Sequence, residues 1–204
     1  MLSADEALER LREGNERFAS DVRSSEAVVN GMRRAEVAAA QEPFAIVLGC
    51  SDSRVPAEII FDQGLGDLFV IRVAGNIVAP SQVDSVEFAA ERFGTRLVVV
   101  LGHSTCGAIR ATLEELARPA EARSTRLRSI VDRIRPSIEP VYRTGRHLSD
   151  EQLMREAVRA NIRASVSQLR RGSRTIEVLE RRDGLRVVGA EYSLETGRVD
   201  FFET

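Results

Sequence analysis

Four runs of almost purely apolar residues recur along the chain, at residues 44–48, 68–73, 97–101 and 185–190. Strands that are buried on both faces show no alternation of polar and apolar residues, so these runs predict the inner strands of a parallel sheet. Stretches of helical periodicity separate them. This order of strands and helices predicts an α/β fold, with a mostly parallel β-sheet flanked by helices.

Residues 1–41 are predicted to form a helical arm in two parts. Ser3 and Glu6 have the spacing of a capping box, which predicts the start of the first helix, and residues 23–41 form the second part. Further helices are expected between the strands, at residues 56–61, 80–93 and 107–117.

The remainder of the chain adds a helical extension and a final strand. Residues 123–171 are predicted to be helical and Arg-rich, and we expect Pro136 and Pro140 to break the helix. Residues 199–202 predict a last strand that follows a turn and pairs antiparallel at the sheet edge. We expect one domain over residues 1–204, with the α/β core at 42–204.

Composition limits the possible functions. The chain has 204 residues, of which 43% are hydrophobic, and a net charge of −2, so we expect a packed core and neither a nucleic-acid nor a membrane partner. All 29 basic residues are Arg, which excludes a Schiff-base or phosphate-loop lysine. Because no secretory signal opens the chain and no apolar run is long enough to span a membrane, we expect a cytoplasmic protein with free or metal-bound thiols.

The candidate chemistry lies directly after two of the predicted strands. Cys50 follows the run at 44–48, and His103 and Cys106 follow the run at 97–101. Sites in open α/β sheets form at the carboxyl ends of the strands, so these three side chains are expected to converge. Two Cys and one His are a zinc ligand set that leaves one position open for water or for Asp52. The alternative is that both Cys are small core residues and His103 is a loop residue with satisfied hydrogen bonds.

The sequences around these residues resemble the β-class carbonic anhydrases. The resemblance rests on Cys50-Ser51-Asp52-Ser53-Arg54 and on Gly102-His103-Ser104-Thr105-Cys106-Gly107, and it extends to residues 66–76 and 85–89. It implies a zinc ion, one per chain, held by Cys50, His103 and Cys106. It also implies an Asp52–Arg54 dyad, with Asp52 as a fourth ligand in a closed form only, and an active-site amide at Gln41.

The resemblance gives these residues roles in the hydration of carbon dioxide. Zinc lowers the pKa of a bound water to about 7, Asp52 accepts a hydrogen bond from that oxygen, and Arg54 holds Asp52. Gln41 donates to the substrate or to bicarbonate. Alternatively, Asp52 and Arg54 form a structural ion pair, and Gln41 caps a helix. Candidate pocket residues, which could equally be core residues or come from a neighbouring subunit, are Val55, Phe69, Phe88 and Gly107.

Two departures from the family pattern concern secondary features. Phe88 occupies a position where many plant members have Tyr. Some bacterial members carry a second, non-catalytic bicarbonate site that includes a Trp and an Arg; here Val47 occupies the Trp position. We therefore expect that site to be absent and Arg72 to have a structural role, for example at a subunit interface. His147 is expected in a solvated loop.

The leading functional prediction is therefore zinc-dependent, reversible hydration of carbon dioxide to bicarbonate. Alternatives are hydrolysis of carbonyl sulfide or carbon disulfide on the same scaffold, or a non-catalytic zinc-binding protein. The Asp52–Arg54 dyad favours an enzyme, because a structural zinc site would not need it. The resemblance and the apolar positions of the arm predict a homodimer or homotetramer.

Overall fold

The computed structural model describes residues 2–22, 24, 31–119 and 127–202. Within these residues, five strands form one sheet in the order β2-β1-β3-β4-β5. The first four are parallel, and β5 runs antiparallel to β4, which confirms the predicted edge strand. The strands are β1 (Ala45–Gly49), β2 (Leu68–Arg72), β3 (Leu97–His103), β4 (Arg186–Tyr192) and β5 (Val199–Phe202).

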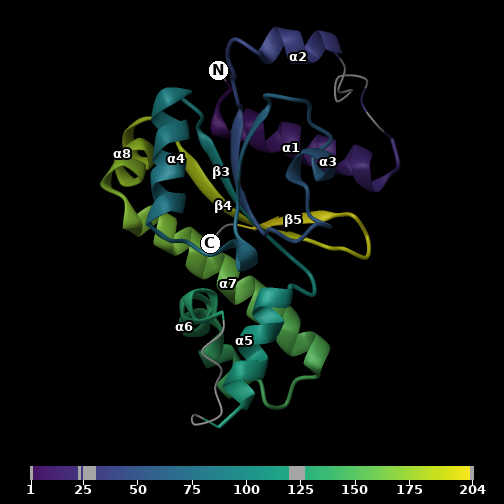
Figure 1. The fold of residues 1–204 in the computed structure, drawn as a ribbon, viewed down its shortest axis with the longest axis vertical. Coiled ribbons are helices and arrows are strands. Elements are labelled where there is room, and N and C mark those ends of the chain that lie inside the picture. Colours follow the sequence, from purple (N-terminus) through teal and green to yellow (C-terminus); the bar gives the residue numbers. More distant parts are fainter. Residues whose placement is uncertain (1, 23, 25–30, 120–126, 203–204) are drawn as a thin grey trace.

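Helices cover both faces of the sheet (Figure 1). On one face α1 (Ala4–Ala19) and α3 (Ala57–Ile60) pack against the strands. The other face carries a larger group, of which α5, α6 and the first part of α7 extend beyond the carboxyl ends of the strands. This group is α4 (Pro80–Arg92), α5 (Gly107–Ala117), α6 (Arg128–Thr144), α7 (Asp150–Gly172) and α8 (Arg174–Arg182).

The predicted arm differs from the observed one in its packing. The capping box of Ser3 and Glu6 is present, and the apolar positions Ala7, Leu8 and Leu11 of α1 are buried against β1, β3 and α3 of the same chain. They therefore do not need a partner surface, contrary to the expectation, because the sheet face itself covers them. The second part contains α2 (Gly31–Val37), which has no buried residue.

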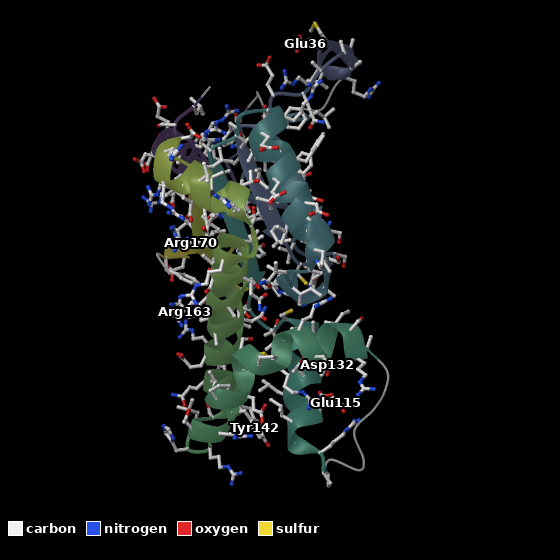
Figure 2. The ribbon with its side chains drawn as sticks, turned by 90° about the vertical axis from the view of Figure 1, so that its left-hand side faces the viewer. Glu36, Glu115, Asp132, Tyr142, Arg163 and Arg170 are labelled. Carbon is white, nitrogen blue, oxygen red and sulfur yellow. The ribbon has the colours of Figure 1, made fainter. Side chains whose placement is uncertain are left out.

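Some residues of the predicted elements lie outside the described residues: 1, 23 and 25–30 in the arm, and 123–126 at the start of the extension. Figure 1 shows α2 apart from the two layers, near the amino ends of the strands. Figure 2 shows Glu36 of α2 at that same end.

Pro136 and Pro140 do not break the helix, so this expectation was wrong. Both lie inside α6 on its exposed side, while Val131, Ile134 and Ile138 are buried on the other side. Because Pro136 and Pro140 have no N–H, the carbonyls of Asp132 and Pro136 lose their helical donors, and on this exposed side water can replace those donors. The helix instead ends at Gly145.

The strands differ in burial according to their place in the sheet. Every residue of β1 and β3 is buried, as their apolar sequences predict. β2 was also expected to be buried on both faces, but Phe69, Val70 and Ile71 are only half-buried and Arg72 is exposed. The reason is that β2 forms the edge of the sheet and has only β1 as a neighbour.

Candidate metal centre and active site

Cys50, His103 and Cys106 converge, as predicted, into one buried cluster. Their ligand atoms all lie within 4.8 Å of one another, and the two sulfurs are 4.0 Å apart. Among the described residues this is the one group of His, Cys, Asp and Glu side chains that could hold a metal ion. Three donors from two separate segments of the chain thus meet in one buried place.

The parallel pairing of β1 and β3 causes this convergence. Gly49, the last residue of β1, lies opposite Leu101 of β3, so both strands deliver the next residues to the same edge of the sheet. Cys50 follows β1 directly, and His103 is the last residue of β3. After a turn in which Thr105 has a φ of 54°, Cys106 caps the amino end of α5.

His103 presents one nitrogen to the cluster. Its Nδ1 lies 2.9 Å from the Ser104 carbonyl, which can only accept, so Nδ1 carries the proton and Nε2 has a free lone pair. Nε2 is fully buried and has no hydrogen-bond partner among the described residues. Leaving a buried polar atom unpaired costs about 1–3 kcal/mol, and a metal ion removes that cost. A carbonyl acceptor on the other ring nitrogen is the usual arrangement for a metal-bound histidine.

The two thiols have opposite pKa shifts. Their mutual hydrogen bond lowers the pKa of Cys50 to about 4, against the effect of burial, and the backbone N–H groups of Gly75 and Asp52 lower it further. The same bond to Cys50 raises the pKa of Cys106, and burial adds to this. The Cys50 thiol thus loses its proton readily, whereas the Cys106 thiol beside it does not. A divalent cation is the partner that allows both sulfurs to be thiolates, and two sulfurs with one imidazole suit zinc. The residues therefore fit the metal.

Asp52 and Arg54 form the predicted pair at the rim of the cluster. Arg54 Nε and Nη2 donate to the two carboxylate oxygens at 2.9 and 2.8 Å, and the Arg54 backbone N–H donates at 3.0 Å. These bonds, with the Arg54 side chain first, hold the pKa of the Asp52 carboxyl well below its usual range. Asp52 Oδ2 lies 3.8 Å from Nε2 of His103, so the carboxylate is next to the donor set while Arg54 retains it.

Arg72 holds this loop through two contacts that the sequence did not predict. Its Nε donates to the Cys50 carbonyl at 3.1 Å and its Nη2 donates to the Asp52 carbonyl at 2.6 Å. The expected structural role is therefore present, but it lies within the chain rather than only at an interface. The register of the two strands could have predicted these contacts. The end of β2 lies opposite the end of β1, which places Arg72 beside Gly49.

The β4–β5 hairpin holds the second loop of the cluster. Ser104 Oγ donates to Glu195 at 2.9 Å and accepts from the Leu194 backbone N–H at 3.0 Å, and Ser104 N donates to the Tyr192 carbonyl. The carbonyl of this same Ser104 accepts from His103. A turn at residues 195–197 was predicted, but its contact with the His103 loop depends on strand order, which the sequence did not reveal.

The predicted pocket residues divide into two groups. Val55 is buried three residues after Asp52, and Gly107 lies directly after Cys106, where an added Cβ would meet no atom within 4 Å. Phe69 and Phe88 instead lie 6.2 Å apart, between ring centres, in a cluster with Phe93. Because α4 runs back along the sheet and Phe93 directly follows its last residue, this aromatic cluster lies toward the amino ends of the strands.

Gln41 also lies away from the metal cluster in its own chain. It is exposed and precedes β1, whereas Cys50 follows β1. A five-residue strand spans roughly 17 Å at about 3.3 Å per residue, so Gln41 and the cluster occupy opposite ends of the sheet. His147 is exposed in the loop between α6 and α7, as expected.

Comparison with known proteins agrees with this geometry. The profile of the carbonic anhydrase family matches residues 45–199, which include all three candidate ligands and the dyad. A carbonic anhydrase of Mycolicibacterium smegmatis is 40% identical over 196 residues, covering 95% of this chain and 91% of that protein. The chain belongs to the β-class carbonic anhydrase family. The family resemblance predicted from the two motifs is thereby confirmed.

Solved β-class carbonic anhydrases share the fold. The enzyme CafA of Aspergillus fumigatus superimposes with a TM-score of 0.76 at 22% identity, covering 97% of this chain and 89% of that one. One of two tetrameric β-carbonic anhydrases of Sordaria macrospora gives a TM-score of 0.69 at 23% identity, covering 85% and 91%. The predicted α/β fold is thus confirmed by its neighbours as well as by its strand order.

Proposed function

We propose that this chain, as one domain, catalyses the reversible hydration of carbon dioxide to bicarbonate, with one zinc ion held by Cys50, His103 and Cys106. Family membership and a 40% identical carbonic anhydrase support the activity. The observation that carries the proposal is the buried, unpartnered Nε2 of His103 among two cysteine sulfurs, beside a carboxylate that an arginine holds.

The division of labour follows from these contacts. Zinc bound there supplies a Lewis acid that lowers the pKa of water to about 7. Asp52, kept ionised by Arg54, accepts a hydrogen bond from the attacking water and thereby directs its lone pair to the carbon of carbon dioxide. Arg54 holds both oxygens of Asp52, which keeps the carboxylate from turning toward the ligand set.

A closed form arises if Arg54 releases Asp52. The carboxylate, already 3.8 Å from His103 Nε2, would then be free to take a ligand position that water would otherwise hold. Hydroxide formed from water and the Asp52 carboxylate would compete for the same open ligand position. Lower pH reduces hydroxide while Asp52 stays ionised, so we expect lower pH to favour the closed form.

The substrate side combines residues of two chains. Carbon dioxide is apolar and needs little more than a dry pocket, for which Val55 and the open space at Gly107 serve within one chain. Gln41, Phe69 and Phe88 serve from a second copy in a homodimer or homotetramer. Their position at the opposite end of the sheet, and the 53% exposure of Phe88, support this assignment. The Sordaria macrospora relatives are tetrameric.

We also propose a cytoplasmic location. Cys50 and Cys106 are free thiols, which serve as ligands only where they stay reduced. Within the described residues, no helix is both long and apolar enough to cross a membrane.

The test is stopped-flow carbon dioxide hydration on protein whose zinc content has been verified, run beside carbonyl sulfide and carbon disulfide hydrolysis. We expect rapid hydration that is lost on chelation and restored by zinc. The retained dyad and the family's curated members favour this activity over the hydrolases and over a non-catalytic zinc protein. Hydrolysis of carbonyl sulfide in the absence of carbon dioxide hydration would contradict the proposal.

A further inference from the structure

The turn between β2 and α4 makes direct contact with one candidate ligand. This turn is η2 (Ala74–Asn76), and the Gly75 backbone N–H donates to Cys50 Sγ at 3.4 Å. Gly75 and Asn76 both have positive φ, at 69° and 43°. Two consecutive left-handed residues, one of them not Gly, persist only where the surroundings hold them. The structure should therefore contain groups that hold this turn.

Two polar side chains of α7 hold it. Asn161 Nδ2 donates to the Gly75 carbonyl at 2.8 Å, and Ser165 Oγ donates to the Asn76 carbonyl at 3.0 Å. The two residues are four apart, so they share one face of the helix, which runs along the sheet (Figure 2). Asn161 is 3% exposed and Ser165 is 2% exposed. Burying an amide and a hydroxyl among apolar neighbours is costly unless they are hydrogen-bonded, and here both donate to the turn.

Close packing fixes the distance between α7 and the turn. A Cβ at Gly102 of β3 would lie 2.5 Å from the Ile162 side chain, and a Cβ at Gly75 would lie 2.7 Å from the Ile134 side chain. Asn161 Oδ1 lies 3.4 Å from Ser137 Oγ of α6, whose hydroxyl donates to the Ile134 carbonyl at 2.6 Å. Small residues thus let α6, α7 and β3 approach the turn, and the amide and the hydroxyl hold it there.

We propose that Asn161 and Ser165 are positioning residues for the metal centre, because they hold the Gly75 N–H against the sulfur of Cys50. This inference rests on the zinc site of the proposed function. A hydrogen bond to a ligand thiolate withdraws electron density from the sulfur and fixes its direction, and groups that orient ligands in this way typically change metal affinity about 10- to 100-fold. Neither residue touches the metal or the substrate.

The experiment uses the cobalt-substituted full chain and the zinc protein. The sulfur-to-cobalt charge-transfer band reports the electron density on the sulfurs, and chelator competition gives the zinc dissociation rate. The variants are Asn161→Leu and Ser165→Ala. The matched control is Thr95→Val: Thr95 is also buried and donates to a backbone carbonyl, that of Pro43 at 2.7 Å, but both residues precede their strands, at the opposite end of the sheet from the cluster.

We expect Asn161→Leu to move the band to lower energy and to speed zinc loss on the order of 10-fold or more, with a smaller change in the same direction in Ser165→Ala. Thr95→Val should lower stability, because it leaves the Pro43 carbonyl without its donor, while leaving both quantities unchanged. If Asn161→Leu does not fold, Ser165→Ala carries the test, since it removes one hydroxyl only.

Two results would overturn the inference. One is an unmoved band and a zinc dissociation rate within about twofold of the parent in the α7 variants. The other is an equal shift in Thr95→Val, which would reveal a general loss of rigidity. By contrast, a parent protein without a sulfur–cobalt band would refute the proposed metal site itself, so the two failures are distinguishable.

Discussion

The carboxyl ends of β1 and β3 carry donors that one chain buries and orients completely: two thiols, an imidazole and a carboxylate, each bound by neighbours of the same chain. At the amino ends, the residues that the family resemblance assigns to the same reaction are not gathered. Gln41 is exposed before β1, and Phe88 is largely exposed on α4. This contrast supports our proposal that one chain supplies all the candidate metal ligands, whereas a second chain completes the substrate pocket.

The largest expected effect comes from breaking the carboxyl end. Cys50→Ser or His103→Ala removes one of three ligands, so we expect loss of the metal and of essentially all hydration activity. Elemental analysis measures the zinc content, and stopped-flow hydration measures the activity. His147→Ala is the matched control and should keep both, because His147 is exposed in a loop. Full zinc retention in both ligand variants would contradict the assigned site.

The dyad should give the next largest effect. Arg54→Ala frees Asp52, and Asp52→Asn removes the acceptor of the water proton, so each should lower turnover on the order of 100-fold with zinc retained. Arg143→Ala is the control: Arg143 forms an ion pair with Glu139 on the exposed side of α6 and should have no effect on turnover. Near-normal rates in the dyad variants would identify Asp52 and Arg54 as a structural pair.

A complementation experiment addresses the amino end. Gln41→Ala should lower turnover about 10-fold, the value of one hydrogen bond. If Gln41 acts from a second chain, assemblies that mix Gln41→Ala chains with Cys50→Ser chains should regain activity. In them, a site with intact ligands receives its Gln41 from the neighbour.

Each variant assembled alone is the control for this mixture. Failure of isolated mixed oligomers to exceed the Gln41→Ala rate per intact site would count against a site shared between chains.

The smallest expected effect concerns the contribution of Asp52 to stability. The pKa of this carboxyl is lower in the folded chain than the value of about 3.9 in the unfolded one, so its contribution is present above pH 4 and is lost as the pH falls below it. Because Arg54 is more than half exposed, the contribution should be below about 1 kcal/mol.

Urea unfolding of the parent and of Asp52→Asn, compared at each pH, measures this contribution. The difference in the free energy of unfolding should stay constant from about pH 5 to 8 and shrink in acid. If the difference instead grows toward low pH, folding does not lower the pKa of Asp52.

Much of the fold and the metal cluster could be predicted from sequence because the signals are local. Unbroken apolar runs marked β1 and β3, and both ligand segments begin where these runs end. Prediction failed where burial depends on a neighbour. β2 has the same apolar character but forms an edge, and α6 continues through two prolines because they face solvent. Arg72 and Asn161 act through backbone carbonyls, which no residue type reveals.

The sequence by itself determined the identity of the donors and the strand ends that carry them, since residue type decides which atoms can bind a metal and hydrophobic pattern decides where a strand stops. Only the tertiary structure decided what surrounds those donors. Strand order brings the β4–β5 hairpin to Ser104, register brings Arg72 to the Cys50 loop, and helix packing brings Asn161 and Ser165 to the η2 turn. These contacts join residues far apart in the chain, and their geometry depends on packing distances that no local pattern encodes.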